Sequence, residues 1–291
     1  MRPKPKKQDR GFALVTVLWA MVIVSAAVAG VTAVTRGDAR RNQRQRERAE
    51  LTAAADALVS LVILQLVNVN PNSRLAVDGT PFAGSFAGRP ARVSIQDEAG
   101  RIDLNRAPGD ILSRLLRAHG MQDEPAQALT DKVLDWREAS IGKRLNGAKA
   151  DDYHDAGLRY GPRDGPFASV EELKLVMGLP PGLFDRIRPA LTVHSQSSSV
   201  DPAVAPRAAL AALPGMSEER IVATLEARSG RVLQEDSTLV ASSILQAQSY
   251  TGHAFEITVG ISGTEPLRLT RTAAIRLTGQ SNAPVWIYYW N

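Results

Sequence analysis

One stretch of the sequence gathers carboxylates around a polar loop. Hard oxygen ligands on a flexible loop are what Ca²⁺ prefers in proteins. The stretch is therefore a candidate calcium site, with calcium as the candidate cofactor, and a solvated surface loop is the alternative. The candidate ligands, which flank a loop containing Asn146 and Gly147, are Asp135, Glu138, Asp151, Asp152 and Asp155.

The sequence contains none of the common catalytic motifs. The chain has no cysteine, so it has no thiol nucleophile, no disulfide and no cysteine-based zinc site. It contains neither a Gly-x-Ser-x-Gly elbow nor a glycine-rich phosphate loop. The histidines lack the spacing of a His-x-x-x-His or His-Glu-x-x-His metal motif. They are His119, His154, His194 and His253. We therefore predict a protein that is not an enzyme.

A short pattern recurs three times: a leucine, an apolar residue three positions later, then a glycine followed by an apolar residue. Each copy predicts a helix that ends at Gly120, Gly178 or Gly215, where a left-handed backbone costs little. The pattern resembles helix-hairpin-helix modules, which bind the DNA backbone. In binding hairpins a second glycine lets backbone N–H groups approach a phosphate. The residues at that position here are Gln122, Pro180 and Ser217. The pattern thus favours structural packing over phosphate binding.

The distribution of charge also disfavours a nucleic-acid partner. The formal net charge is +5. Residues 1–10 carry a net +4 and residues 36–50 a net +3, which leaves a net −2 for residues 51–291. The basic residues therefore flank an apolar segment and do not predict a large basic face for nucleic acid.

The elements that position these motifs begin with an apolar helix. Residues 11–35 contain no charge. As a helix they would measure roughly 37 Å, enough to cross a hydrocarbon core of about 30 Å with some tilt. An apolar stripe with helical period continues through residues 51–69, so we expect an amphipathic extension that stops near Pro71. A secretory signal cut near Ala27-Val28-Ala29 is the alternative, but the apolar run is longer than a signal core.

The rest of the chain predicts an α+β head. Residues 70–90 read as a loop rich in Gly and Pro, residues 91–95 as a strand and residues 102–105 as a second extended piece. Residues 107–190 are mainly helical, with a loop at 139–166. The period then becomes two, which predicts antiparallel strands near 254–261, 267–277 and 285–289. This order predicts an antiparallel sheet domain interrupted by a mainly helical insertion.

Several short sequence motifs resemble those of a known protein family. Residues 6–15, Lys-Lys-Gln-Asp-Arg-Gly-Phe-Ala-Leu-Val, resemble the prepilin peptidase recognition sequence of type IV pilins and type II secretion pseudopilins. Thr16 stands where most pilin-like proteins have Glu, and the lack of that Glu is a mark of the K-type minor pseudopilin. Residues 97–105, 165–173 and 191–193 are similar to phrases of the same family. The sequence therefore resembles type II secretion system minor pseudopilin K, the general secretion pathway protein K family, over nearly its whole length.

The resemblance implies a pilin-like domain with a large helical domain inserted in it, and the hairpin-like modules belong to the insertion. The implied parts are a prepilin-like leader at 1–11, a transmembrane helix at 12–35, the first part of the pilin-like domain at 36–104, the inserted helical domain at 105–190 and the second part of the pilin-like domain at 191–291.

The resemblance also implies processing, location and partners. Prepilin peptidase would cut between Gly11 and Phe12 on the cytoplasmic side, and the new amine of Phe12 would be methylated. The protein would cross the inner membrane once, with its N-terminus in the cytoplasm and its head in the periplasm. Thr16 suits a subunit at the filament tip, because in the pilin family the usual Glu neutralises the amine of the preceding subunit. The implied partners are minor pseudopilins I and J, then H, with the inner-membrane secretion platform.

The same family bears on calcium. K-type pseudopilins bind calcium in their helical domain, in a loop with more acids than this one. Ser140 and Lys149 stand where carboxylates are expected. Two other functions stay open from the sequence. One is a membrane-anchored helix-hairpin-helix DNA-binding protein, and the other is a minor pilin of a different type IV filament system.

Overall fold

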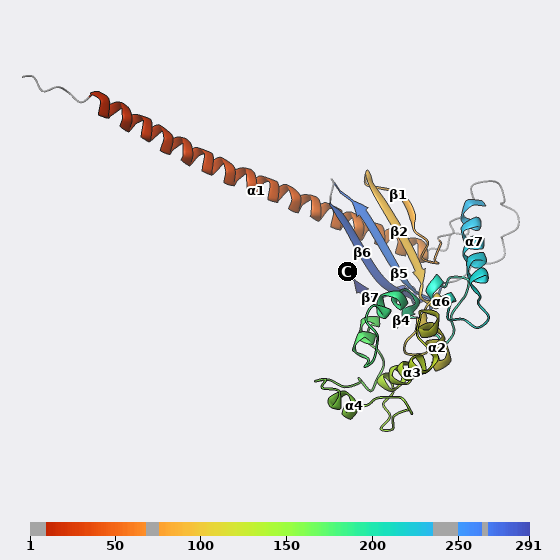
Figure 1. Cartoon of the computed structure of the whole chain (residues 1–291). Coiled ribbons are helices and arrows are strands. Elements are labelled where there is room, and N and C mark those ends of the chain that lie inside the picture. Colours follow the sequence, from red (N-terminus) through yellow and green to blue (C-terminus); the bar gives the residue numbers. More distant parts are fainter. Residues whose placement is uncertain (1–9, 68–75, 235–249, 264–266) are drawn as a thin grey trace, which may run out of the picture.

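The computed structural model shows an α+β chain with one long helix, an antiparallel sheet and a set of short helices, as the sequence predicts (Figure 1). The described residues are 10–67, 76–234, 250–263 and 267–291. Within them, side chains are not described at 10–13, 31–40 and 229–234. The predicted leader therefore lies almost wholly outside the described residues.

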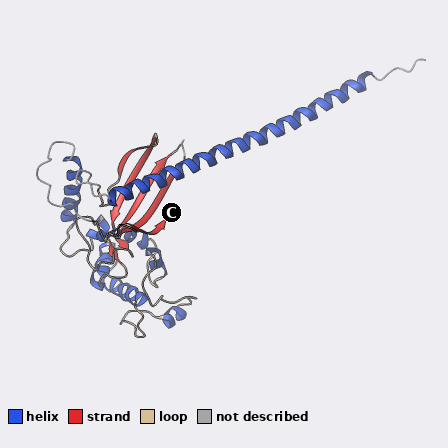
Figure 2. Cartoon of the chain, turned by 180° about the vertical axis from the view of Figure 1, so that it is seen from behind, coloured by secondary structure: helices blue, strands red, loops and turns tan. Residues whose placement is uncertain are grey.

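Helix α1, Arg10–Val67, is 58 residues long, or roughly 87 Å at the rise of an α-helix. Its N-terminal half extends away from the head, and its C-terminal half lies across one face of the sheet (Figures 1 and 2). The C-terminal half packs through apolar side chains spaced three or four residues apart, which places them on one face of the helix. These buried side chains are Leu51, Ala55, Val59, Val62 and Leu66.

Two stretches of α1 are candidates for a membrane span. By length and composition Arg41–Val67 could cross a membrane, with a mean hydropathy of 1.7, and Leu14–Gly30 is a shorter apolar helix among the described residues. The first stretch includes the half that packs on the sheet. The second has exposed apolar side chains along its length, for example Leu14 at 70% and Val28 at 61% exposed. Because its apolar surface has no cover within the described head, Leu14–Gly30 is the stretch that suits a membrane.

The sheet has five antiparallel strands in the order β1-β2-β5-β6-β7. The strands predicted from alternating apolar residues are all present. Strand β5 shows the alternation most fully, because Ile257, Val259 and Ile261 are buried while the residues between them are only partly covered. The bounds are β1 Phe82–Phe86, β2 Arg89–Asp97, β5 Ala254–Ser262, β6 Arg268–Leu277 and β7 Val285–Trp290.

Strand β1 corrects the prediction of a loop over residues 70–90. It pairs with β2 through a two-residue turn at Ala87 and Gly88, whose φ angles are 50° and 74°. Turns of this handedness match the twist of a β-hairpin. The strand sequence Phe-Ala-Gly-Ser-Phe has no β-branched residue and is mostly exposed, so it lacks the pattern of a buried strand.

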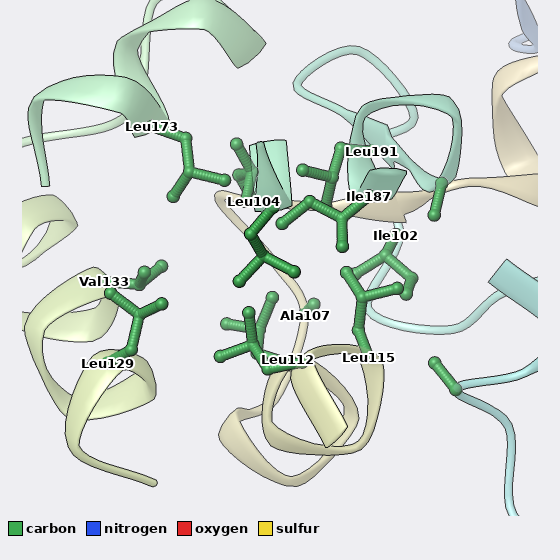
Figure 3. Close-up of a cluster of buried hydrophobic side chains, with 14 of the residues drawn as sticks. Ile102, Leu104, Ala107, Leu112, Leu115, Leu129, Val133, Leu173, Ile187 and Leu191 are labelled. Carbon is green, nitrogen blue, oxygen red and sulfur yellow. The ribbon is translucent and has the colours of Figure 1, made fainter. Parts of the chain in front are cut away.

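The chain between β2 and β5 forms a second unit, called here the inserted unit (residues 98–234). Strands β3, Ile102–Asp103, and β4, Leu191–Thr192, pair in parallel and close the segment between them. Figure 3 shows apolar side chains from several elements meeting around this pair. The helical elements are η1 Glu98–Gly100, α2 Gly109–Ala118, α3 Asp123–Arg137, α4 Ala150–Asp155, η2 Val170–Leu175, α5 Leu183–Ile187, η3 Arg188–Ala190, α6 Arg207–Leu210 and α7 Glu218–Gln234.

The core of the inserted unit continues past residue 190, where the sequence placed the end of the insertion. Leu191, Leu210 and Ile221 are buried in the same apolar cluster as Leu104 and Leu115. Residues beyond β4 therefore complete the core that begins before α2. The five-part division of the chain stays a prediction.

The three recurring glycines have the left-handed conformation that the pattern predicts. Their φ angles are 100° at Gly120, 90° at Gly178 and 71° at Gly215. The leucine that begins each pattern is buried in the core of the inserted unit, and these are Leu115, Leu173 and Leu210. Each pattern thus turns the chain between two helical segments and contributes a side chain to the core.

Candidate functional site

The exposed part of α1 is the first candidate surface for function. All side chains from Leu14 to Gly30 are exposed, and Thr16 is among them. Gly11 and Phe12 begin the same helix, but their side chains are not described and residues 1–9 lie outside the described residues. Cleavage between Gly11 and Phe12, methylation of Phe12 and the assembly role of Thr16 therefore stay predictions.

A polar contact fixes the other half of α1 on the sheet. Asp56 accepts a hydrogen bond from the Trp290 Nε1–H of β7, with 2.8 Å between N and O. The same carboxylate lies 3.0 Å from Nε of Arg271 on β6. Asp56 thus ties the helix to two strands at the edge of the apolar contact.

A charged cluster joins the sheet to the inserted unit, and we call it the junction. Arg101 forms ion pairs with Glu98 at 3.0 Å and with Glu256 of β5 at 2.8 Å. The Tyr289 hydroxyl donates to Glu256 at 2.8 Å. The side-chain amide of Gln96 donates to the Val204 carbonyl oxygen at 2.8 Å. These contacts connect strands β2, β5 and β7 of the sheet with two segments of the inserted unit.

Burial, charged neighbours and hydrogen bonds together shift the pKa values of groups at and near the junction. It raises the pKa of Glu98 to about 7, although Arg101 acts in the opposite direction. Burial also opposes ionisation of Glu256, but there Arg101 prevails and the pKa is lowered. The hydrogen bond to Asp97, at 2.7 Å, raises the pKa of His253. Burial lowers the pKa of His194. These shifts predict that the contact between the sheet and the inserted unit responds to pH.

The structure does not bring the five predicted calcium ligands around one point. Asp151 and Asp155 are exposed on α4. Asp152 accepts a hydrogen bond from the Lys149 backbone N–H at 2.9 Å and pairs with Lys143. Among the described residues, no group of three or more His, Asp or Glu side chains is placed to hold a metal ion.

The two remaining predicted ligands face cationic side chains. Arg144 lies 2.7 Å from an oxygen of Asp135, and 2.8 Å from each oxygen of Glu138. Lys149 Nζ lies 2.8 Å from the carbonyl oxygens of these same two residues. The donor set as folded does not fit calcium, because its oxygens already bind the chain's own cations. Calcium binding itself stays an untested prediction.

The helices that follow the recurring glycines carry acids in their first turn. A helix N-terminus attracts phosphate through its free N–H groups and its dipole. Carboxylates at the same place repel phosphate. The acids are Asp123 and Glu124 of α3, Asp185 of α5, and Glu218 and Glu219 of α7. This arrangement counts against binding of a DNA backbone by the hairpin-like modules.

Comparisons with known proteins agree with this arrangement of elements. Residues 93–196 match the family described as type II secretion system (T2SS), protein K. Type II secretion system protein K of Pseudomonas aeruginosa is 26% identical over 275 residues, which cover 85% of this chain and 80% of that protein. Protein K of Pectobacterium carotovorum subsp. carotovorum is 24% identical over 220 residues, or 67% of each chain. The chain is therefore similar to the type II secretion protein K family over most of its length.

A solved structure shares the fold. The crystal structure of the GspK–GspI–GspJ complex from the enterotoxigenic Escherichia coli type 2 secretion system contains a chain that superposes with a TM-score of 0.56 at 16% identity. The match covers 86% of this chain and 98% of that one. The protein K family is a structural component of the pseudopilus, so this chain is a minor pseudopilin, and its N-terminal apolar helix fits a membrane anchor.

Proposed function

We propose that this minor pseudopilin forms the tip of the pseudopilus and begins or caps its assembly. The position of the inserted unit carries the proposal. It lies at the end of the head that is farthest from the free end of α1 (Figure 1). In a filament built on packed N-terminal helices, heads stack along the helix direction. A bulky unit at the far end of the head obstructs the addition of another head above it.

Helix α1 is the proposed assembly surface. Its exposed apolar side chains can leave the lipid only by packing against another apolar helix. Thr16 supports the tip position. A carboxylate at that place would need the amine of a subunit above, and an unpaired carboxylate in lipid is costly.

The proposed first partners are minor pseudopilins I and J, with H next below. In the similar complex, GspK is assembled with GspI and GspJ. Because the fold is shared over most of both chains, we propose that the corresponding proteins bind here along α1. The secretion platform of the inner membrane would then add further subunits from below.

The proposed location is the inner membrane, crossed once, with the N-terminus in the cytoplasm and the head in the periplasm. The leader-like residues 6–15 support this orientation, since prepilin peptidase acts on the cytoplasmic side. Mass spectrometry of the purified protein tests it. We expect a mature chain that begins at Phe12 with a methylated amine. A chain that begins after residue 29 would indicate an ordinary secretory signal.

The decisive experiment is co-purification of the full chain with minor pseudopilins I and J from the same genome, extracted in mild detergent. We expect one complex that contains all three proteins, with only one copy of this chain. Co-purification with the major pseudopilin alone, or several copies of this chain in one complex, would contradict the tip position.

Thr16 offers a sharper version of this experiment. Thr16→Glu introduces a carboxylate with no amine above it into the apolar helix. A charge costs about 2.5–3.5 kcal/mol at the centre of a membrane helix, which is an upper limit for Thr16 near the end of the span. We expect it to reduce recovery of the three-protein complex. Thr16→Val has nearly the same shape and is the matched control that should assemble normally. Equal recovery of the two variants would argue against a tip subunit.

A further inference from the structure

We infer that Lys149 and Arg144 act as built-in cations that hold the acidic loop of the inserted unit (residues 135–164) in the place of a divalent ion. The inference rests on the geometry of this loop and does not depend on the tip position of the subunit. It replaces the expected calcium site with one that the chain fills with its own side chains.

Lys149 sits in a cage of oxygens. Its Nζ lies 2.8 Å from the carbonyl oxygens of Asp135 and Glu138, and 2.6 Å from Oδ1 of Asp164. Backbone carbonyls and a carboxylate are ligands that Ca²⁺ also uses. An ammonium group has three donors, and here each meets an acceptor. The side chain is only 15% exposed, so the site is largely shielded from water.

Arg144 neutralises the two carboxylates beside this cage. It lies 2.7 Å from one oxygen of Asp135 and binds both oxygens of Glu138, while its backbone N–H donates to the other oxygen of Asp135 at 3.0 Å. Asp135 is buried, with 1% of its side chain exposed. A buried carboxylate needs a partner of this kind, because an unpaired buried charge is strongly unfavourable.

The backbone of the loop is shaped around the same carboxylate. A Cβ added at Gly147 would lie 1.8 Å from Oδ2 of Asp135, so a side chain at that position cannot be accommodated without a shift. The loop therefore closes tightly over Asp135, with two cations inside or beside it. A calcium ion would have to displace Lys149 and would meet the charge of Arg144.

This arrangement has a consequence for the head. The end of α3, the start of α4 and Asp164 all meet at Lys149, so its ammonium joins three segments of the loop. Because the cation is covalently part of the chain, the loop folds at any calcium concentration. Chelation of calcium should leave it unchanged.

Thermal unfolding of the full chain in detergent tests the inference. We expect the Tm of the wild type to change by less than about 1 °C between millimolar calcium and excess EDTA. Lys149→Met keeps the apolar stem and removes the charge, and it should lower the Tm by about 3–8 °C. Lys143→Met is the matched control. Lys143 belongs to the same loop but is 50% exposed and forms a surface pair, so the expected change is about 1–2 °C.

Two outcomes would overturn the inference. One is a rise of the wild-type Tm with calcium that EDTA reverses. The other is an equal shift for the Lys149 and Lys143 variants, which would mean that Lys149 does not hold the loop. If Lys149→Met does not fold, Lys149→Gln against Lys143→Gln gives the same comparison with a milder change, and the same order of Tm values is expected.

Discussion

The two contact surfaces of the sheet differ in chemistry. Helix α1 packs on one face through apolar side chains, with Val59 and Leu66 of the helix among the core that contains Phe255 of the sheet. The inserted unit meets the sheet mainly through charged and polar groups, among which Arg101 and Glu256 form the central ion pair, while Val204 adds one apolar contact. The helix contact is therefore stabilised mainly by burial of apolar surface, and the junction mainly by ion pairs and directional hydrogen bonds.

The difference indicates different roles for the two contacts. Apolar burial is non-directional and does not titrate, so the helix and sheet should remain one body over a wide range of pH. Hydrogen bonds and ion pairs fix an orientation, but they lose strength when a partner changes its protonation state. The helix contact therefore suits a rigid connection between α1 and the sheet. The junction suits a contact through which the orientation of the inserted unit can respond to pH.

The largest expected effect lies in the apolar contact. Leu66 is fully buried between α1 and the sheet. Leu66→Ala should reduce the free energy of unfolding by about 2–5 kcal/mol, through lost transfer energy and a residual cavity. The loss should be the same at pH 5 and pH 8. Leu64→Ala, on the exposed side of the same helix, is the control and should change stability little. Equal losses for both would show that the helix does not pack as described.

Much of this contact could be predicted from the sequence. The apolar period of residues 51–69 and the alternation of β5, β6 and β7 give the two faces that meet. Both signals are local, because they depend only on residues a few positions apart. Strand β1 escaped prediction for the same reason. Its pairing depends on β2 and on the turn at Gly88, and its own side chains bury little.

The second prediction concerns the titration of the junction. Glu98 is buried and its pKa is raised from 4.5 to about 7. The folded state therefore holds a proton that the unfolded state has lost over this range. The stabilising contribution is complete below about pH 4.5 and is lost as the pH rises through 7, with an upper bound of about 3 kcal/mol. His253 has the same sign, since its raised pKa also favours the protonated folded state.

Glu98→Gln isolates this contribution. The wild type and the variant are compared by thermal unfolding of the full chain from pH 5 to pH 8. His194, whose pKa is lowered, works in the opposite direction but is common to both proteins. We expect the Tm of the wild type to fall more steeply with pH than that of Glu98→Gln. Parallel curves would mean that Glu98 does not titrate in this range.

The junction could not be predicted from the sequence. Glu98 and Arg101 lie three residues apart, but Glu256 joins them from a strand more than 150 residues later. The burial that raises the pKa of Glu98 is likewise a property of the whole fold. The acidic loop shows the same limit. Its carboxylates are visible in the sequence, whereas the placement of Lys149 among oxygens of three segments depends on how the loop closes.

The smallest expected effect tests the polar edge of the apolar contact. Asp56→Asn keeps an oxygen for the Trp290 N–H but removes the ion pair with Arg271. Both charged side chains are partly exposed, so the loss in free energy of unfolding should be about 0.2–1 kcal/mol and should shrink at high salt. Denaturant unfolding at low and high salt measures it. Glu50→Gln is the control, because Glu50 also pairs with an arginine, Arg89, but is itself 67% exposed, and it should have an even smaller effect. A loss as large as that of Leu66→Ala would mean that charge, and not apolar burial, holds α1 on the sheet.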